Sequence, residues 1–247
     1  MLQRTLEELG LNAWPAISSL LYDGWVLRFG GGFTRRANSV NPLYASSLPL
    51  DNKIDACEAA YARDGQATVF KLTPASQPTE LDAVLADSGY RAEATTSVQV
   101  ADLSRQALRP DPAVSLTERV SDQWLDAQAA LVGGPQPYRA VERRMLESIV
   151  PPKAFASLRQ DGRPVALGLA VAERGYVGLS SIVTAVDARN QGLGRRMVGH
   201  LLAWGQQQGA HTAHLAVMLD NAPAHRLYAR FGFREAYRYW YRVKRQP

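Results

Sequence analysis

Hydrophobic residues recur at regular spacing through the C-terminal half of the chain, from about residue 113. Apolar positions three or four apart lie on one face of a helix, whereas apolar runs between turn residues are typical of strands. Helices are predicted at 121–132, 138–149, 191–208 and, with Asn221 as cap and Gly232 as stop, at about 221–231. Strands are predicted at 113–120, 154–160, 164–172, 176–186, 212–219 and 234–243.

Two tight turns join three of these strands, at Asp161-Gly162 and at Glu173-Arg174-Gly175. Strands joined by such short turns pair antiparallel. The only crossover suited to parallel strands is the one through the helix at 191–208. The order β-α-α-β-β-β-α-β-α-β therefore predicts an α/β fold of the α+β type, a mostly antiparallel mixed sheet flanked by helices.

The N-terminal half repeats part of this order less regularly. Segment 24–40 is typical of a hairpin that turns at Gly30-Gly31-Gly32. It is followed by a helix at 53–65, a strand at 67–72, a helix at 79–89 and a strand at 90–100.

A local likeness indicates an internal repeat: GYRAEA follows LADS in the first half, and GFREAY follows YARF in the second. A degenerate duplication and two merely similar α/β layouts both explain it. Pro110 and Pro112 mark a linker between the halves. The predicted domains are therefore 1–109 and 110–247.

The composition is typical of a soluble globular protein, with 46% of the 247 residues hydrophobic and 21% charged. The apolar runs are shorter than the roughly 20 residues that a membrane span needs, and MLQRTLEELG lacks a signal-peptide pattern. We expect a cytoplasmic protein with no membrane partner. The single cysteine, Cys57, has no partner for a disulfide or a thiolate metal site, and is expected in the core.

The net charge of +5 does not by itself indicate a partner. Of the 28 basic residues 4 are lysine and 24 arginine, and the arginines are scattered. Proteins that bind nucleic acids usually gather basic residues in one patch or arm. We therefore expect no nucleic-acid partner, although a mild positive excess helps to attract an anionic ligand.

The segment RNQGLG, residues 189–194, stands where a predicted strand is followed by a helix. The first backbone N–H groups of a helix have no partner within it, and the helix dipole adds about half a positive charge there. Gly192 and Gly194 remove side chains at this position, and Leu193 anchors the loop in the core. We therefore expect the amides from Asn190 to Arg195 to hold a pyrophosphate.

Glycines at this spacing also occur in three different settings. A nucleotide-hydrolysing P-loop needs Gly-Lys-Ser/Thr, but the chain has Gly194-Arg195-Arg196. A dinucleotide-binding fold needs a third glycine where Met197 stands and more parallel strand-helix units than this order contains. A glycine turn without a ligand is the third alternative.

The same residues resemble a family signature. RNQGLG resembles the Arg/Gln-x-x-Gly-x-Gly/Ala motif of the GCN5-related N-acetyltransferase (GNAT) superfamily. The segment HLAVMLDNAPAHRLYARFGF, with Asn221 and Tyr228 before Gly232-Phe233, and the order of elements from about residue 113 are also similar to that family. The resemblance implies a GNAT fold for the second domain.

The resemblance also implies that the first domain is a second, degenerate GNAT-like copy. It has no Gly-x-Gly before the helix at 53–65, and Leu85 stands where the repeat aligns Tyr228. This copy is therefore not expected to bind a cofactor in the same way.

For the second domain, the resemblance implies that acetyl-CoA or another acyl-CoA binds. The backbone edge of Ile182, Val183 and Thr184 would pair with the pantetheine arm, and an amide near Val183 would polarise the thioester carbonyl. The pyrophosphate would lie on the loop formed by Arg189, Asn190, Gln191, Gly192, Leu193, Gly194 and Arg195.

The family reaction would be direct attack of an amine on the thioester in a ternary complex. Tyr228 would protonate the leaving thiolate as general acid, the alternative being an ordinary buried aromatic. Asn221 would contact the pantetheine, cap its helix, or do both. The general base is unassigned: Ser180 and Ser181 cannot take a proton unaided, and Glu173 is expected at a hairpin tip.

Two further groups of residues carry candidate chemistry. Arg35, Arg36 and Asn38, on the second arm of the N-terminal hairpin, could line an acceptor pocket for a carboxylate-bearing amine, or form a polar sheet face. His211 and His214 are three apart on a predicted strand and would face opposite ways, so we expect no metal site.

These observations predict an acetyl-CoA-dependent N-acetyltransferase that acts on a primary amine of a small molecule or peptide. The alternative is a non-catalytic acyl-CoA-binding or interaction module. The acceptor, the acyl-chain preference and the oligomeric state, a homodimer included, cannot be derived from the sequence.

Overall fold

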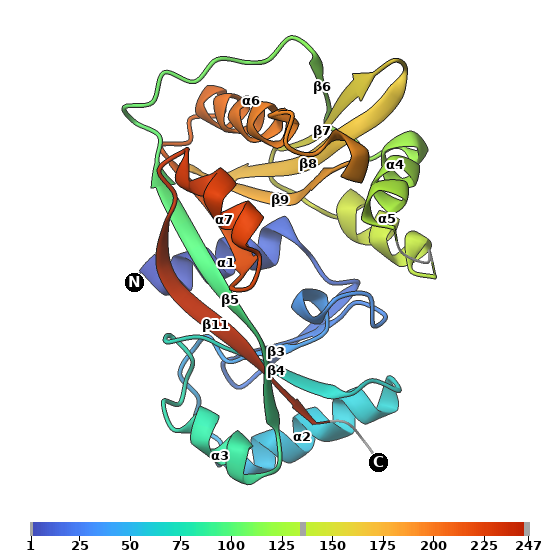
Figure 1. Ribbon diagram of the computed structural model, residues 1–247. Coiled ribbons are helices and arrows are strands. Elements are labelled where there is room, and N and C mark those ends of the chain that lie inside the picture. The colour runs from blue at the N-terminus through green and yellow to red at the C-terminus, as the bar shows by residue number, and fades with distance from the viewer. Residues whose placement is uncertain (1, 134–136, 245–247) are drawn as a thin grey trace. The chain divides into compact units, whose positions relative to one another are not determined.

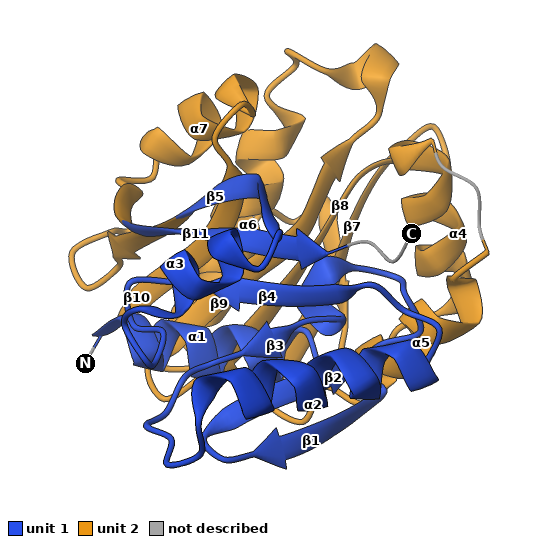
Figure 2. Ribbon diagram, turned by 90° about the horizontal axis from the view of Figure 1, so that it is seen from below, with its two compact units in different colours: residues 1–97, 237–247 blue, residues 98–236 orange. Residues whose placement is uncertain are grey.

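The computed structural model describes residues 2–133 and 137–244. The chain forms two compact units (Figure 2): residues 1–97 with 237–247 are unit 1, and residues 98–236 are unit 2. The division passes through two long strands, β5 (Arg91–Asp102) and β11 (Arg234–Lys244). The predicted domains 1–109 and 110–247 stay a prediction.

Unit 1 begins with α1 (Leu2–Ala13), β1 (Ser18–Tyr22), β2 (Trp25–Phe29), η1 (Arg35–Ala37), β3 (Val40–Asn41), α2 (Leu50–Arg63), β4 (Thr68–Leu72) and α3 (Leu81–Asp87). Its strands follow the order β1-β2-β3-β4-β11-β5. β1 and β2 pair antiparallel across the turn at Asp23-Gly24, and β3 pairs parallel with β4. The second part of β11 pairs antiparallel with β4, with Trp240 opposite Leu72.

The core of unit 1 gathers side chains from β2, β4, α2 and α3. On α2 the buried residues Ile54, Cys57 and Tyr61 are three or four positions apart, so one face of the helix is buried. This face packs against β4 (Figure 1). Cys57 is a buried core residue, as expected, and Leu85 of α3 is fully buried in the same cluster.

The prediction of an extended second arm in the N-terminal hairpin is wrong for the first part of that arm. Residues Arg35–Ala37 form a short 3-10 helix, η1, and β3 has only two residues. The Asn38 side chain explains this: its Oδ1 accepts hydrogen bonds from the amides of Gly30 (2.8 Å) and Gly32 (3.0 Å), and its Nδ2 donates to the Thr34 carbonyl (2.7 Å). These bonds close a compact loop in place of an extended arm. α1 and β1 were not predicted.

Unit 2 continues with β6 (Val114–Thr117), α4 (Asp122–Val132), α5 (Arg139–Glu147), β7 (Lys153–Gln160), β8 (Arg163–Glu173), β9 (Tyr176–Thr184), η2 (Val186–Ala188), α6 (Leu193–Gln207), β10 (Thr212–Met218) and α7 (Ala222–Ala229). Its strands follow the order β5-β10-β9-β8-β7-β6. β6, β7, β8 and β9 are antiparallel neighbours, whereas β9 and β10 are parallel. The predicted meander and its single parallel crossover are thus confirmed.

The short turns of the meander have positive φ at both central residues. These are Asp161 (φ 50°) with Gly162 (75°), and Arg174 (50°) with Gly175 (77°). Such turns match the twist of the paired strands. They hold β7, β8 and β9 in register, and so position the strand that leads to the glycine-rich loop.

Helix α6 packs along β8 and β9 (Figure 1). Its apolar face is fully buried at Met197, Val198, Leu201 and Leu202. The helix begins at Leu193, two residues later than predicted, because Gly192 has a left-handed φ of 78° that a helix cannot contain. Within the part of the chain that the structure describes, no helix is long and apolar enough to cross a membrane.

Candidate functional site

Strands β9 and β10 are paired only over the first part of their length. Their parallel register runs from Tyr176 opposite Thr212 to Leu179 opposite Leu215. Beyond that pair β9 continues to Thr184 and β10 to Met218, with no further pairing between these described residues. One backbone edge of 180–184 is therefore open, and its side chains are half-buried.

A β-bulge lies at the point where the strands separate. In the β8–β9 register, Ser180 faces Leu169 and Val183 faces Leu167, so that Gly168 alone stands against two residues of β9. One of these, Ser181, has a φ of 52°. A bulge bends its strand and increases the local twist, which accounts for the loss of pairing with β10.

Gly168 allows close packing at this bulge. A Cβ atom there would lie 2.7 Å from Cδ1 of Ile182 and 2.7 Å from Cδ1 of Leu201. The missing side chain thus lets β9 lie close to both β8 and α6 at the position where β9 bends.

The direction of the β9 amides follows from the β8 pairing. The amide of Ala185 donates to the carbonyl of Val165 at 2.9 Å, and Val183 faces Leu167 in the same register. Because successive amides of a strand alternate in direction, the Val183 amide also points to β8. The amides of Ile182 and Thr184 therefore point to the open edge.

The loop after β9 leads to a set of unpaired backbone donors. Asn190 has a φ of 62° and Gly192 a φ of 78°, and the exposed chain turns sharply into α6. The first helical bond runs from the Arg196 amide to the Gly192 carbonyl, 3.0 Å. Among the described groups, none accepts a hydrogen bond from the amides of 190–195. They form an exposed array of donors at the helix N-terminus.

The two glycines of this loop have different surroundings. A Cβ at Gly192 would meet nothing within 4 Å, so this position combines a left-handed backbone with open space. A Cβ at Gly194 would lie 3.3 Å from Cδ2 of Leu227 and 3.6 Å from Oγ1 of Thr184. Gly194 therefore allows α6 to approach α7 and β9. Leu193 is 3% exposed and anchors the loop in the core, as predicted.

The charges around the loop favour an anion. Asp111 is neutralised by Arg196, whose Nε and Nη2 lie 2.7 and 3.1 Å from its two carboxylate oxygens. Asp187 is paired with Arg163 at 2.8 Å. Arg189 and Arg195 are exposed and form no ion pair with the described residues. The loop thus carries two cations whose charge is not balanced locally.

Tyr228 lies on α7 and is 8% exposed. Its ring centroid is 5.8 Å from that of Phe233. Burial raises the pKa of the Tyr228 phenol to about 12, because the phenolate loses its hydration there. The hydroxyl therefore stays protonated at neutral pH and is available as a proton donor.

Two side chains fix the start of α7. The Asn221 Oδ1 accepts a hydrogen bond from the Ala224 amide at 3.2 Å, which confirms the predicted cap. The Nε2 atom of His225 lies 3.1 Å from the carbonyl oxygen of Met218, and its Nδ1 atom lies 2.9 Å from the side-chain nitrogen of Gln99. His225 thus ties the helix that carries Tyr228 to the end of β10 and to β5. This role was not predicted.

The other candidates in unit 2 are accounted for by structural contacts. Burial lowers the pKa of His214 to about 4, so it is neutral. His211 precedes β10, and the ring of Tyr176 lies near both histidines, at 5.8 and 6.4 Å. The premise that both stand on one strand and face opposite ways is therefore wrong. Glu173 ends β8 and pairs with Arg174. Within the described ranges no group of His, Cys, Asp and Glu is arranged to hold a metal.

The three residues proposed for an acceptor pocket belong to unit 1. Arg35 forms an ion pair with Glu93, and its guanidinium lies 5.8 Å from the ring of Tyr241. Arg36 lies 4.6 Å from the Trp14 ring. Asn38 is 7% exposed, and its side chain is used in closing the loop at Gly30. A role of these residues toward an acceptor stays a prediction.

Comparison with known proteins identifies relatives over most of the chain. Residues 3–242 match the protein family described as “Probable histone acetyltransferase Rv0428c C-terminal”. The chain is 31% identical over 248 residues to “Uncharacterized N-acetyltransferase YobR” of Bacillus subtilis, and the match covers 98% of each chain. It is 31% identical over 228 residues to “Probable histone acetyltransferase Rv0428c” of Mycobacterium tuberculosis, covering 87% of this chain and 65% of the relative.

A third relative matches a shorter stretch. Aminoglycoside N(6')-acetyltransferase type 1 of Serratia marcescens is 32% identical over 128 residues, which are 47% of this chain and 87% of the relative.

Solved structures share the fold. A GCN5-related N-acetyltransferase from Kribbella flavida superposes with a TM-score of 0.69 at 17% identity, covering 99% of this chain and 95% of the other. A tandem GNAT protein from the clavulanic acid biosynthesis pathway has a TM-score of 0.61 at 15% identity, covering 98% and 88%. At these identities the likeness concerns the fold alone. The predicted fold, a mostly antiparallel mixed sheet flanked by helices, is confirmed.

Proposed function

This chain belongs to the GCN5-related N-acetyltransferase superfamily, and from that premise we propose how it binds its substrates. The chain is an acetyltransferase of the GNAT type, which sets aside a non-catalytic module. We propose that it transfers the acetyl group of acetyl-CoA to a primary amine of a small molecule or peptide. The observation that carries the proposal is the row of unpaired amides at 190–195.

These amides are suited to the pyrophosphate of acetyl-CoA. Unpaired N–H groups and the dipole of α6 stabilise negative charge at the helix N-terminus. Gly192 leaves the approach to the loop open, and Arg189 and Arg195 add positive charge. Asn190, Gln191, Leu193 and Gly194 contribute backbone donors to the same site.

The open edge of β9 is suited to the pantetheine arm. The amides of Ile182 and Thr184 point to this edge, and hydrogen bonds from a strand edge resemble those that a paired strand would supply. We assign the polarisation of the thioester carbonyl to the Ile182 amide, since the neighbouring Val183 amide points to β8. Loss of one such donor costs about 3 kcal/mol of transition-state stabilisation in other enzymes.

Tyr228 is suited to give a proton to the leaving thiolate. The amine nitrogen forms the new bond to the acetyl carbon, the carbon–sulfur bond breaks, and the Tyr228 hydroxyl gives its proton to the sulfur. Tyr228 regains a proton from water, and the amine releases one to water. An amine that binds in its neutral form attacks without a general base, which agrees with the lack of an assigned base. The phenol is kept protonated by burial until it is needed.

The residues of unit 1 support a structural role without bound acyl-CoA. Leu85, which the repeat aligns with Tyr228, is fully buried in the core of unit 1 and carries no proton to transfer. We therefore propose that the degenerate N-terminal GNAT-like copy does not take part in acyl transfer.

Binding and transfer are tested separately. Acetyl-CoA at a hundred times its dissociation constant should add about 2.7 kcal/mol to the free energy of unfolding, visible as a raised melting temperature. Release of the CoA thiol is then followed with a panel of primary amines, with acetyl-CoA alone as the control for hydrolysis. Absence of thermal protection refutes the binding site. Protection without amine-dependent thiol release by any member of the panel refutes the acceptor class.

A further inference from the structure

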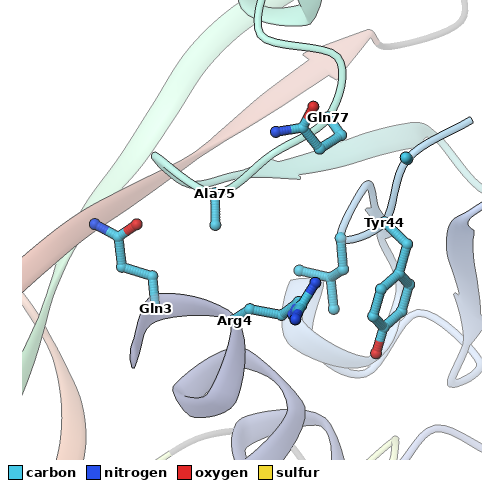
Figure 3. Close-up of a pocket in the computed structure, with 7 residues that line it drawn as sticks. Gln3, Arg4, Tyr44, Ala75 and Gln77 are labelled. Carbon is cyan, nitrogen blue, oxygen red and sulfur yellow. The ribbon is translucent and has the colours of Figure 1, made fainter. Parts of the chain in front are cut away.

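A cavity of about 470 Å³ lies in unit 1, separate in the chain from the loop at 190–195. Figure 3 shows Gln3 and Arg4 of α1, Tyr44, Ala75 and Gln77 around it. Its volume is within the range of about 300–1,000 Å³ that is typical of small-molecule sites. The proposed acetyl transfer does not use this cavity.

Arg4 is the charged group of the cavity. Its guanidinium lies 5.9 Å from the centre of the Tyr44 ring, close enough for a cation–π contact that orients it. The Tyr44 hydroxyl donates a hydrogen bond to Oε1 of Glu8 at 3.1 Å, which fixes the ring in turn. Among the described residues no carboxylate pairs with Arg4, so its fork of N–H donors faces the cavity unpaired (Figure 3).

Two hydrogen bonds hold the backbone of Gln77 at the cavity. Its amide donates to the Pro42 carbonyl at 2.9 Å, and its carbonyl accepts from the indole nitrogen of Trp25 at 2.9 Å. Both backbone groups are thus satisfied, whereas the side-chain amide has no partner among the groups that the structure describes. Gln77 lines the cavity, and its side-chain amide is available there to a ligand.

The remaining lining is apolar and neutral. Leu43 is 4% exposed and Ala75 is half-buried, and both line the cavity with Tyr44. Gln3 adds a second side-chain amide. The lining thus combines one cation, two neutral amides and an apolar surface, and none of its residues is acidic.

We propose that this cavity binds a small organic anion. Its carboxylate or phosphate group pairs with the Arg4 guanidinium, because the planar fork of arginine matches two oxygens of either group. Its apolar part contacts Leu43 and Ala75, and its polar substituents bond to the amides of Gln3 and Gln77. Acetyl-CoA is not the ligand of this site, since we assign it to the loop at 190–195.

The test uses three probes of similar size on the full chain: benzoate, phenyl phosphate and the uncharged benzamide. Titration calorimetry should detect saturable binding of at least one anion and binding of benzamide that is weaker by about tenfold or more. The stronger of the two anions identifies the preferred group. Failure of both anions to bind saturably overturns the proposal.

Matched variants test the position of the site. Arg4→Gln should weaken anion binding by about tenfold or more, because the charge-assisted pair is lost. Arg63→Gln, at an exposed arginine of α2 outside the cavity, should leave it unchanged. Arg4→Lys keeps the charge but not the fork, and should give an intermediate affinity. Equal affinity in wild type and Arg4→Gln overturns the proposal, and the acetyl-CoA protection of each variant is an independent check on the fold and on unit 2.

Discussion

Residue 192 needs a left-handed backbone conformation, and the space beside its Cα must stay free of a side chain. Gly209, just after the other end of α6, is its matched counterpart: φ is 78° at Gly192 and 82° at Gly209, and a Cβ at either meets nothing within 4 Å. A side chain at either position costs about 1 kcal/mol of backbone strain. Only at 192 does the side chain stand among the unpaired amides.

We therefore predict that Gly192→Asp strongly reduces the thermal protection by acetyl-CoA, whereas Gly209→Asp keeps it. The carboxylate at 192 repels the pyrophosphate, and at a few ångströms this costs on the order of 1–4 kcal/mol near a protein surface. Melting temperatures with and without acetyl-CoA measure the effect. Equal protection of the two variants would show that the loop does not hold the diphosphate.

Tyr228→Phe is predicted to lower kcat by about 10²-fold or more, the usual contribution of a general acid. The KM for acetyl-CoA should change little, because the phenyl ring keeps its packing against Phe233. Tyr176→Phe, a half-buried tyrosine of β9, is the control. If kcat and cofactor affinity fall together, Tyr228 is a packing residue.

The pH dependence of the wild type adds a second measurement on Tyr228. Its raised pKa of about 12 means that the phenol is protonated over the whole neutral range. No alkaline fall in kcat should therefore arise from this group until the pH nears that value.

Ionisation of Glu142, on α5, should make the stability of the protein depend on pH. It is 5% exposed, its Oε1 has no partner among the described groups, and desolvation raises its pKa. A raised folded-state pKa favours the protonated form, so stability is lost as the pH rises above the ordinary glutamate pKa. Glu142→Gln should raise the melting temperature more at pH 8 than at pH 4. An equal change at both pH values would mean that ionisation at 142 is not the cause.

At the scale of elements, the position of α7 depends on His225. Leucine at this position would leave the buried Gln99 amide without this partner and would remove the bond to the exposed Met218 carbonyl. Since Tyr228 is one helical turn further on, a shift of α7 displaces the proton donor.

We predict that His225→Leu lowers kcat by about tenfold or more with a smaller change in the KM for acetyl-CoA. His225→Gln, which keeps hydrogen-bonding groups, should restore part of the rate. His211→Leu, at an exposed histidine before β10, is the control. An unchanged kcat in His225→Leu would remove the positioning role.

How far the elements could be predicted depended on how local their causes are. The meander follows from turn residues such as Asp161-Gly162, and α6 from apolar spacing, so both were predicted. The η1 turn was not, because it depends on three hydrogen bonds of one side chain, Asn38. α1 was missed although its buried Leu6 and Leu9 have helical spacing.

The candidate site shows the same dependence on distance along the chain. The glycine loop is a contiguous motif and was predicted from its spacing. The direction of the β9 amides depends on the bulge opposite Gly168, and the His225–Gln99 contact joins residues 126 positions apart. A single sequence carries no periodic signal for either of these pairings.

At the scale of the whole chain, both ends contribute to unit 1. The last strand pairs with β4, the Tyr237 hydroxyl donates to Glu7 of α1 at 2.7 Å, and Trp240 donates to Asp82 at 2.8 Å. Arg242 adds a bidentate pair to Asp82, at 2.8 and 3.1 Å. The alternating pattern of β11 thus closes a core that the first hundred residues begin, a pairing that local patterns do not reveal.

A chain that ends at residue 109, the predicted domain boundary, should therefore not fold by itself. It lacks Tyr237, Tyr239 and Tyr241, all buried, and each buried aromatic side chain contributes about 1.5–3 kcal/mol. Their sum is comparable to the about 5–15 kcal/mol of a typical domain. Thermal melts followed by circular dichroism should show no cooperative transition for residues 1–109, and a cooperative one for the full chain. If residues 1–109 melt cooperatively near the temperature of the full chain, the C-terminal strand is dispensable for unit 1, and the contacts to Glu7 and Asp82 add little to its stability.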